Sequence, residues 1–317
     1  MNSLAAIVGP TGIGKSRLAI RLAWKFDGEI VSADSRQVYR HMDIGTAKLS
    51  IQERAQVRHH LIDIVDPDQD FSLAQYQTLA FNAISGIQKR DKLPVLVGGS
   101  GLYVRAVLEG WQLPEAKPDL ELRHRLEKQA TEAGYSSLYE ELMEVDPAAA
   151  KRIDPRNVRR VIRALEVHHQ TNTTFSRLHD KKGQVYRTLI IGLTLDRKEL
   201  YRRIDRRVDE MLEQGLVAEV EKLVNIGYDF NLPAMSSIGY KQIAMFLKGE
   251  ISLEDAIQQI KYETHRFVRH QYAWFHLNDA RIHWFDVARV PEAEIDGLMS
   301  RFLEGKLDSK ETLLVNE

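Results

Sequence analysis

The chain has 317 residues, 44% of them hydrophobic and 28% charged, with a formal net charge of −1, a composition typical of a globular protein with two domains or one core with a large insertion. It contains no cysteine, which excludes disulfides, zinc–thiolate sites and thiol catalysis, and no apolar run is long enough to cross a membrane. Because no signal peptide precedes the first apolar run, we expect a cytoplasmic protein, and nucleic-acid binding would require a local basic surface.

The first predicted strand, residues 4–8, leads into GPTGIGKS at residues 9–16, and a helix is predicted from about 15 to 26. The octapeptide fits the phosphate-loop pattern G-x-x-x-x-G-K-[ST], in which backbone N–H groups and a helix N-terminus surround an anion. Lys15 would add a charge for the terminal phosphates, and the Ser16 hydroxyl suits Mg²⁺. The pattern therefore predicts a phosphate site made of Gly9, Pro10, Thr11, Gly12, Ile13, Gly14, Lys15 and Ser16.

Three further strands are predicted at residues 29–33, 60–64 and 93–97, and a helix with Ser72 as its N-cap at 72–89. Strands that alternate with helices favour a parallel sheet covered by helices on both faces. Ligands of such sheets bind at the carboxyl ends of the strands. Asp34 and Ser100 each follow a strand, so we expect them in the same crevice as the phosphate loop.

The second half begins with a linker-like stretch at 114–118, and residues 119–174 read as helices without a strand signal. Asp146-Pro147 and Asp154-Pro155 are typical of helix starts. Strands are predicted again at 186–193 and 281–285.

We therefore predict an α/β fold, with a P-loop core formed by residues 1–117 and 185–317. Residues 118–184 would form an all-helical insertion domain.

The expected acidic partner of the phosphate loop is missing from its usual place. In ATPases an acid at the end of an apolar strand helps to hold Mg²⁺, but strand 93–97 is followed by Gly98-Gly99-Ser100. The acid stands instead at Asp34. Three roles are open to Asp34: general base, Mg²⁺ ligand through water, or simple N-cap of a following helix.

The chain resembles the tRNA dimethylallyltransferases, also called tRNA isopentenyltransferases, from its N-terminus to about residue 285. The motifs that carry the resemblance are, in order, GPTGIGKS (9–16), DSRQVYR (34–40), MDIGTAK (42–48), HHLID (59–63), VGGSGLY (97–103), RRVIRALEV (159–167), IGYKQ (238–242) and RFVRHQYAWF (266–275). Ser16 stands where threonine is commoner, and Ile13 where a smaller residue is more usual. A zinc-finger extension found in some eukaryotic relatives is absent, which points to the bacterial type.

The resemblance implies a P-loop nucleotide-kinase-like core whose loop holds the diphosphate of dimethylallyl diphosphate. It also implies that the dimethylallyl group is transferred to N6 of adenosine 37, beside the anticodon of tRNA. It assigns Asp34 as general base and Ser100 as a hydroxyl beside the reacting centre. Lys15, Mg²⁺ and an arginine would balance the charge of the leaving diphosphate. Arg207 is the favoured arginine, with Arg203 and Arg206 as alternatives.

The resemblance also implies contacts with the anticodon stem-loop of tRNA. Near the reacting centre they involve Asp34, Ser35, Arg36, Gln37 and Ser100. In the insertion, Arg159, Arg160 and Arg163 form a basic helix edge for phosphates, together with Arg123. Tyr240 would offer a ring to RNA, although core packing is an equal alternative for it. The remaining contacts are expected from Ile238, Gly239, Lys241 and Gln242, and we expect a monomer.

Three rival functions share some of these features. A P-loop kinase or NTPase would use the same loop, and an adenylate isopentenyltransferase would modify free AMP, ADP or ATP without an RNA surface. The basic helical insertion and the RFVRHQYAWF stretch favour tRNA over free nucleotides. A nucleotide-dependent RNA-binding module would leave Asp34 and Ser100 without a role.

Overall fold

A computed structural model describes residues 3–113, 119–171, 173–176 and 186–307. The chain divides into two compact units, Met1–Leu108 with Gln184–Glu317, and Glu109–Gly183. The second unit starts nine residues before position 118, the predicted start of the insertion. The predicted linker at 114–118 and the predicted boundaries at 118 and 184 lie outside the described residues.

The first unit is an α/β fold, as predicted, built on a six-stranded sheet in the order β3-β2-β4-β1-β5-β6 in which every neighbouring pair is parallel. Its strands are β1 Ser3–Val8, β2 Gly28–Ser32, β3 His59–His60, β4 Leu93–Val97, β5 Arg187–Thr194 and β6 Ile282–Asp286. Its helices are α1 Lys15–Lys25, α2 Ile51–Arg54, α3 Leu73–Gln88, α4 Gly101–Leu108, α9 Arg197–Glu213, α10 Leu216–Ile226, the 3₁₀ turn η2 Ala234–Ser236, α11 Tyr240–Leu247, α12 Leu253–Trp274 and α13 Glu292–Leu303.

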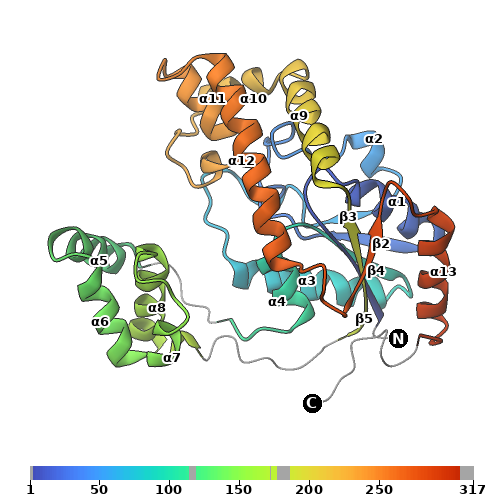
Figure 1. The fold of residues 1–317 in the computed structure, drawn as a ribbon, viewed down its shortest axis with the longest axis horizontal. Coiled ribbons are helices and arrows are strands. Elements are labelled where there is room, and N and C mark those ends of the chain that lie inside the picture. Colours follow the sequence, from blue (N-terminus) through green and yellow to red (C-terminus); the bar gives the residue numbers. More distant parts are fainter. Residues whose placement is uncertain (1–2, 114–118, 172, 177–185, 308–317) are drawn as a thin grey trace. The chain divides into compact units, whose positions relative to one another are not determined.

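Alternation of side chains along the strands builds a separate core on each face of the sheet. Leu4, Ala6 and Val8 of β1 join the core that contains α3 and α4, whereas Ala5 and Ile7 join the core that contains α1 and α13. All five of these β1 residues are fully buried, because β1 lies between β4 and β5 in the middle of the sheet. The helices therefore cover both faces (Figure 1), and the carboxyl ends of the strands stay available for a ligand.

The second unit is helical, as predicted, with α5 Leu120–Glu132, α6 Tyr135–Val145, α7 Pro147–Ala150 and α8 Val158–Thr171. Its small core contains Leu126, Leu138, Leu142 and Leu165. Asp146 caps α7 through the amide of Ala149, as its Asp-Pro sequence predicted.

Two local predictions are wrong. The strand expected at 60–64 stops after His60, because Leu61 and Asp63 adopt positive φ angles of 64° and 57°, which no strand accommodates. Asp154-Pro155 does not start a helix. The Asp154 carboxylate accepts from the Arg156 amide at 3.0 Å and closes a turn, and α8 starts only at Val158.

Within the described residues, no helix is both long and apolar enough to cross a membrane.

Candidate active site

The phosphate loop connects β1 to α1, as its sequence pattern predicts. Gly9 has a φ of 140°, and a β-carbon there would lie 2.6 Å from the carbonyl oxygen of Leu193 on β5, so only glycine fits where the loop leaves the sheet. Ile13 is buried in the core beside α1, which explains a large residue at this position. The half-buried Lys15 donates from Nζ to the Pro10 carbonyl at 2.8 Å, so its charge lies within the loop.

The structure brings Asp34 and Ser100 together at the ends of β2 and β4, as predicted. A β-carbon at Gly98 would lie 2.0 Å from the Ala33 carbonyl oxygen, so glycine permits this close approach. The Ser35 amide donates to Ser100 Oγ at 3.0 Å, and Ser100 Oγ lies 3.3 Å from Ser35 Oγ.

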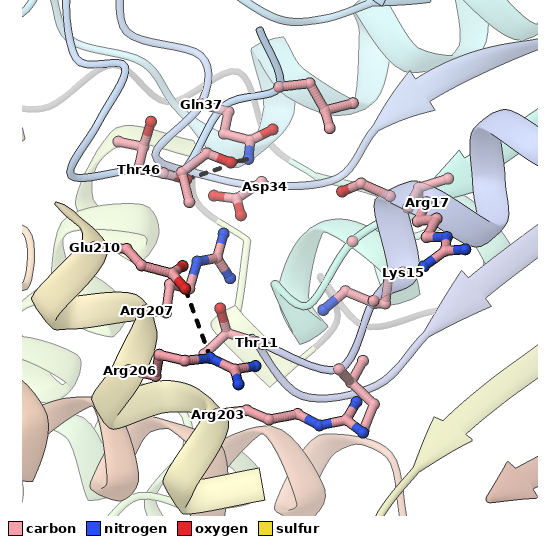
Figure 2. A pocket seen from close by; sticks show the side chains of 18 of the residues that line it. Thr11, Lys15, Arg17, Asp34, Gln37, Thr46, Arg203, Arg206, Arg207 and Glu210 are labelled. Carbon is pink, nitrogen blue, oxygen red and sulfur yellow. Dashed lines mark hydrogen bonds and ion pairs between the residues drawn. The ribbon is translucent and has the colours of Figure 1, made fainter. Parts of the chain in front are cut away.

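Asp34 Oδ1 accepts a hydrogen bond from the Arg36 amide at 2.9 Å. Residues 35–38 form turns and no helix, so Asp34 is not a helix N-cap. Its carboxylate points into the cavity in Figure 2, where the two other roles, general base and Mg²⁺ ligand, remain open to it.

Two adjoining cavities meet at this edge of the sheet. The first, the polar cavity, has a volume of ≈ 610 Å³ and lies between the phosphate loop and the arginines of α9. The second, the apolar cavity, has a volume of ≈ 410 Å³ and includes Leu102, Met211, Phe267 and Trp274. Both are lined by Thr11, Gly12, Lys15, Asp34, Thr46, Ala47 and Arg207.

The three candidate arginines of α9 differ in their surroundings. Arg203 pairs with Glu199 at 3.4 Å, and Arg206 pairs with Glu210 at 3.5 Å. Arg207 alone of the three lines both cavities, and its side chain points toward the same open space as Lys15 and Asp34 (Figure 2). This position makes Arg207 the best placed of the three to meet an anion in the shared space.

The polar cavity has excess positive charge. The pKa of Lys15 is lowered to about 8 by burial, a shift that Asp34 partly opposes and Arg207 reinforces. Burial also lowers the pKa of Arg207, again partly opposed by Asp34. Because burial disfavours the charge of both cations, a bound anion would stabilise their charged forms.

Gln271 of α12 belongs to the RFVRHQYAWF motif but was not predicted as a site residue. It accepts from the Thr11 amide at 2.8 Å and donates to the Gly99 carbonyl at 3.0 Å, and its side chain is buried. It therefore ties the phosphate loop to the loop that carries Ser100. The only sequence signal was a glutamine inside an otherwise basic and aromatic run.

The predicted RNA contacts of the IGYKQ motif separate into three groups. Ile238 and Gly239 line the apolar cavity, and Lys241 is exposed. Tyr240 and Gln242, however, are 0% and 4% exposed. The expectation that the Tyr240 ring faces RNA is therefore wrong, because the ring lies in the core and its hydroxyl donates to Glu219.

The other predicted contacts near Asp34 lie along the cavities. Ser35 and Arg36 line the apolar cavity, and Gln37 lines the polar one. Arg36 Nη1 also donates to the Pro233 carbonyl at 3.3 Å, and Gln37 Nε2 to the Thr46 carbonyl at 3.2 Å.

In the helical unit, Arg159 and Arg160 are exposed on α8. Arg123 and Arg163 both bind the fully buried Glu166, Arg123 through bonds of 2.8 and 2.9 Å. These two arginines therefore have a structural role in the unit, and Arg159 and Arg160 are the better candidates for contacting phosphates.

Comparison with known proteins identifies the family. Residues 37–278 match the model of the IPP transferase family. A tRNA dimethylallyltransferase of Dehalococcoides mccartyi is 49% identical over 95% of this chain and 92% of its own length, and that of Roseiflexus castenholzii is 55% identical over 87% and 90%.

Solved structures agree with this match. The tRNA isopentenylpyrophosphate transferase of Bacillus halodurans is 42% identical, with a TM-score of 0.72 over 96% of this chain and 98% of that one. A eukaryotic dimethylallyltransferase acting on tRNA has a TM-score of 0.83 at 28% identity, over 98% and 81%. The chain therefore belongs to the IPP transferase family, among relatives named tRNA dimethylallyltransferases.

Proposed function

We propose that this protein transfers the dimethylallyl group of dimethylallyl diphosphate to N6 of adenosine 37 in tRNA, with release of diphosphate. One observation carries the proposal: Lys15, Asp34 and Arg207 line both cavities, so an anion site and a candidate base face one shared space. The names of the relatives support the same reaction.

The polar cavity would hold the diphosphate. Positive charge would come from the amides of the phosphate loop, from Lys15 and from Arg207. These groups would stabilise the diphosphate most strongly in the transition state, when negative charge develops on it as the leaving group. Ser16 offers a hydroxyl ligand on the wall of this cavity, which fits Mg²⁺, an ion that usually keeps several waters and binds few protein groups. When bound, Mg²⁺ would neutralise part of the diphosphate charge.

Asp34 would act as the general base. The N6 lone pair is delocalised into the adenine ring, so a carboxylate that accepts an N6 proton raises the nucleophilicity of the amine. A bond forms between N6 and C1 of the prenyl group, the bond from C1 to the diphosphate oxygen breaks, and the proton passes to Asp34. Ser100, fixed by the Ser35 amide, would bind the leaving oxygen.

The apolar cavity would receive the adenine and the prenyl chain, beside Leu102, Phe267 and Trp274. A base in a loop leaves its stack at lower cost than a base in a duplex. Ser35, Arg36 and Gln37 would contact the flipped base and its neighbours, and Arg159 and Arg160 would bind phosphates.

Mass spectrometry of tRNA tests this function directly. After incubation with the protein, Mg²⁺ and dimethylallyl diphosphate, we expect one added C5H8 unit on the adenosine 3′ of the anticodon. Prenylation of free AMP at a comparable rate would support an adenylate isopentenyltransferase instead. A larger rise in melting temperature with ATP than with dimethylallyl diphosphate at equal concentration would support a kinase or NTPase.

A further inference from the structure

The motif MDIGTAK, residues 42–48, forms one wall of the two cavities, and we call it the wall segment. Thr46 and Ala47 line both cavities, and Gly45 lines the apolar one. The Thr46 carbonyl also accepts from Gln37 Nε2 at 3.2 Å. The position of the wall segment therefore sets the shape of the cavities and the orientation of the Gln37 amide.

The wall segment has no regular secondary structure of its own. It consists of turns, with bonds from the Ala47 amide to the Ile44 carbonyl at 2.9 Å and from the Lys48 amide to the Asp43 carbonyl at 3.0 Å. Ala47 has a positive φ of 52°, a conformation that costs free energy for a residue with a β-carbon. Such a segment needs contacts from outside to hold a single conformation.

Glu219 of α10 supplies one such contact. Its Oε2 accepts from the amides of Asp43 and Ile44 at 3.0 and 2.8 Å, and its Oε1 accepts from the Gly45 amide at 3.2 Å. Three consecutive backbone N–H groups thus surround one carboxylate, the arrangement known as an anion nest.

Tyr240 completes this contact. Its hydroxyl donates to Glu219 Oε1, and burial together with the charge of Glu219 raises the pKa of Tyr240, so the hydroxyl stays a donor. A β-carbon at Gly45 would lie 2.4 Å from Cε2 of the Tyr240 ring. The ring therefore packs on the backbone of the wall segment, and glycine at position 45 allows this.

Lys48 fixes the other end of the wall segment. Its side chain is 1% exposed, and its Nζ donates to the Tyr39 carbonyl at 2.6 Å, to Asp43 at 2.8 Å and to Asp63 at 2.6 Å. Lys48 therefore holds this end of the segment from the first half of the chain, whereas Glu219 and Tyr240 hold the part around Gly45 from the second half.

We propose that Glu219 and Tyr240 are positioning residues, which hold the wall segment in the conformation that shapes the cavities and orients Gln37. Tyr240 of the IGYKQ motif would then have a structural role and no contact with RNA. The IGYKQ and MDIGTAK motifs would be linked because both bond to Glu219. Its catalytic consequence rests on the proposed prenyl transfer, whereas its structural part can be tested without that reaction.

The structural test measures hydrogen exchange of the peptide that spans the wall segment. In Glu219→Gln the amides of Asp43, Ile44 and Gly45 lose a charged acceptor, so we expect their exchange to become at least about tenfold faster, a loss of some 1.4 kcal/mol of protection. The matched control is Glu29→Gln, which removes a buried carboxylate paired with Arg90 and His60. Unchanged exchange of the segment, or equal acceleration in the control, would overturn the proposal.

The catalytic test compares Tyr240→Phe with Tyr139→Phe, which removes a hydroxyl that donates to the Ala150 carbonyl at 2.8 Å in the helical unit. A displacement of about 1 Å can cost roughly a hundredfold in rate. We therefore expect kcat to fall about tenfold in Tyr240→Phe and further in Glu219→Gln, with the double variant no worse than Glu219→Gln alone.

Activity near that of wild type in Glu219→Gln, at temperatures where the protein is folded, would refute the positioning role. A wild-type protein that transfers no prenyl group would refute the proposed function instead, and hydrogen exchange would still decide whether the contact holds the segment.

Discussion

Arg207 and Lys15 line the same polar cavity, where burial, reinforced by the charge of Arg207, lowers the pKa of Lys15 to about 8. A bound diphosphate would stabilise the protonated ammonium, so affinity for the diphosphate should fall as the pH rises through about 8. Above that pH the loss should approach tenfold per pH unit, measured as Kd by calorimetry. Lys15→Arg is the control, because its guanidinium does not titrate in this range and the dependence should vanish. A flat profile for wild type would exclude Lys15 as a diphosphate ligand.

Replacing Asp34 by asparagine should separate the two roles that remain open to it. The asparagine oxygen can still accept from the Arg36 amide, so the turn should persist, but it cannot accept the N6 proton. Loss of a general base costs roughly a hundred- to ten-thousand-fold in rate, and we expect a fall of that size in single-turnover transfer at saturating substrates. Recovery of the rate at higher Mg²⁺ concentration would make Asp34 a metal ligand instead.

Removing the Gln271 side chain should disconnect the phosphate loop from the loop of Ser100. Gln271→Ala leaves the Thr11 amide and the Gly99 carbonyl without these partners, at a cost of about 1–3 kcal/mol. We expect a lower melting temperature and a smaller rise in it when diphosphate is added. Gln77→Ala is the control, since Gln77 is also buried and donates to the Ala106 carbonyl at 2.6 Å. It should lower the melting temperature but keep the rise with diphosphate.

Reversing the charges of Arg159 and Arg160 should weaken tRNA binding through phosphates. Each lost phosphate contact lowers the slope of log K against log salt by about one unit, so the double Glu variant should bind tRNA more weakly and with a flatter salt dependence. Arg163 is unsuited to this test, because a glutamate there would face the buried Glu166. Reversal of Arg125 and Lys128 on α5 gives the same change in net charge and should leave the slope unchanged. Equal effects in both variants would mean that only the overall charge of the unit matters.

The sequence predicts the parts of this protein that depend on local pattern. The order of strands and helices around the phosphate loop follows from apolar runs and glycine spacing, and the meeting of Asp34 with Ser100 follows from the rule for parallel strands. The early end of β3 could not be predicted, because the apolar run continues through Leu61 while the backbone turns to positive φ. The bond of Tyr240 to Glu219 spans 21 positions, and that of Gln271 to Thr11 spans 260. Hydrophobic periodicity describes only local structure, so it could predict neither contact.

The Gln271 bonds also have a consequence for folding during translation. Thr11 and Gln271 are separated by 260 positions, and β1 must pair with β5, which follows the helical unit in the chain. A nascent chain that has emerged only as far as α8 therefore contains β1 and the phosphate loop. It lacks β5, the second strand that pairs with β1, and Gln271, which binds the Thr11 amide. Since domains fold as units during translation, the helical unit can form on the ribosome first, and a truncated chain that ends before α12 would lack a complete anion site.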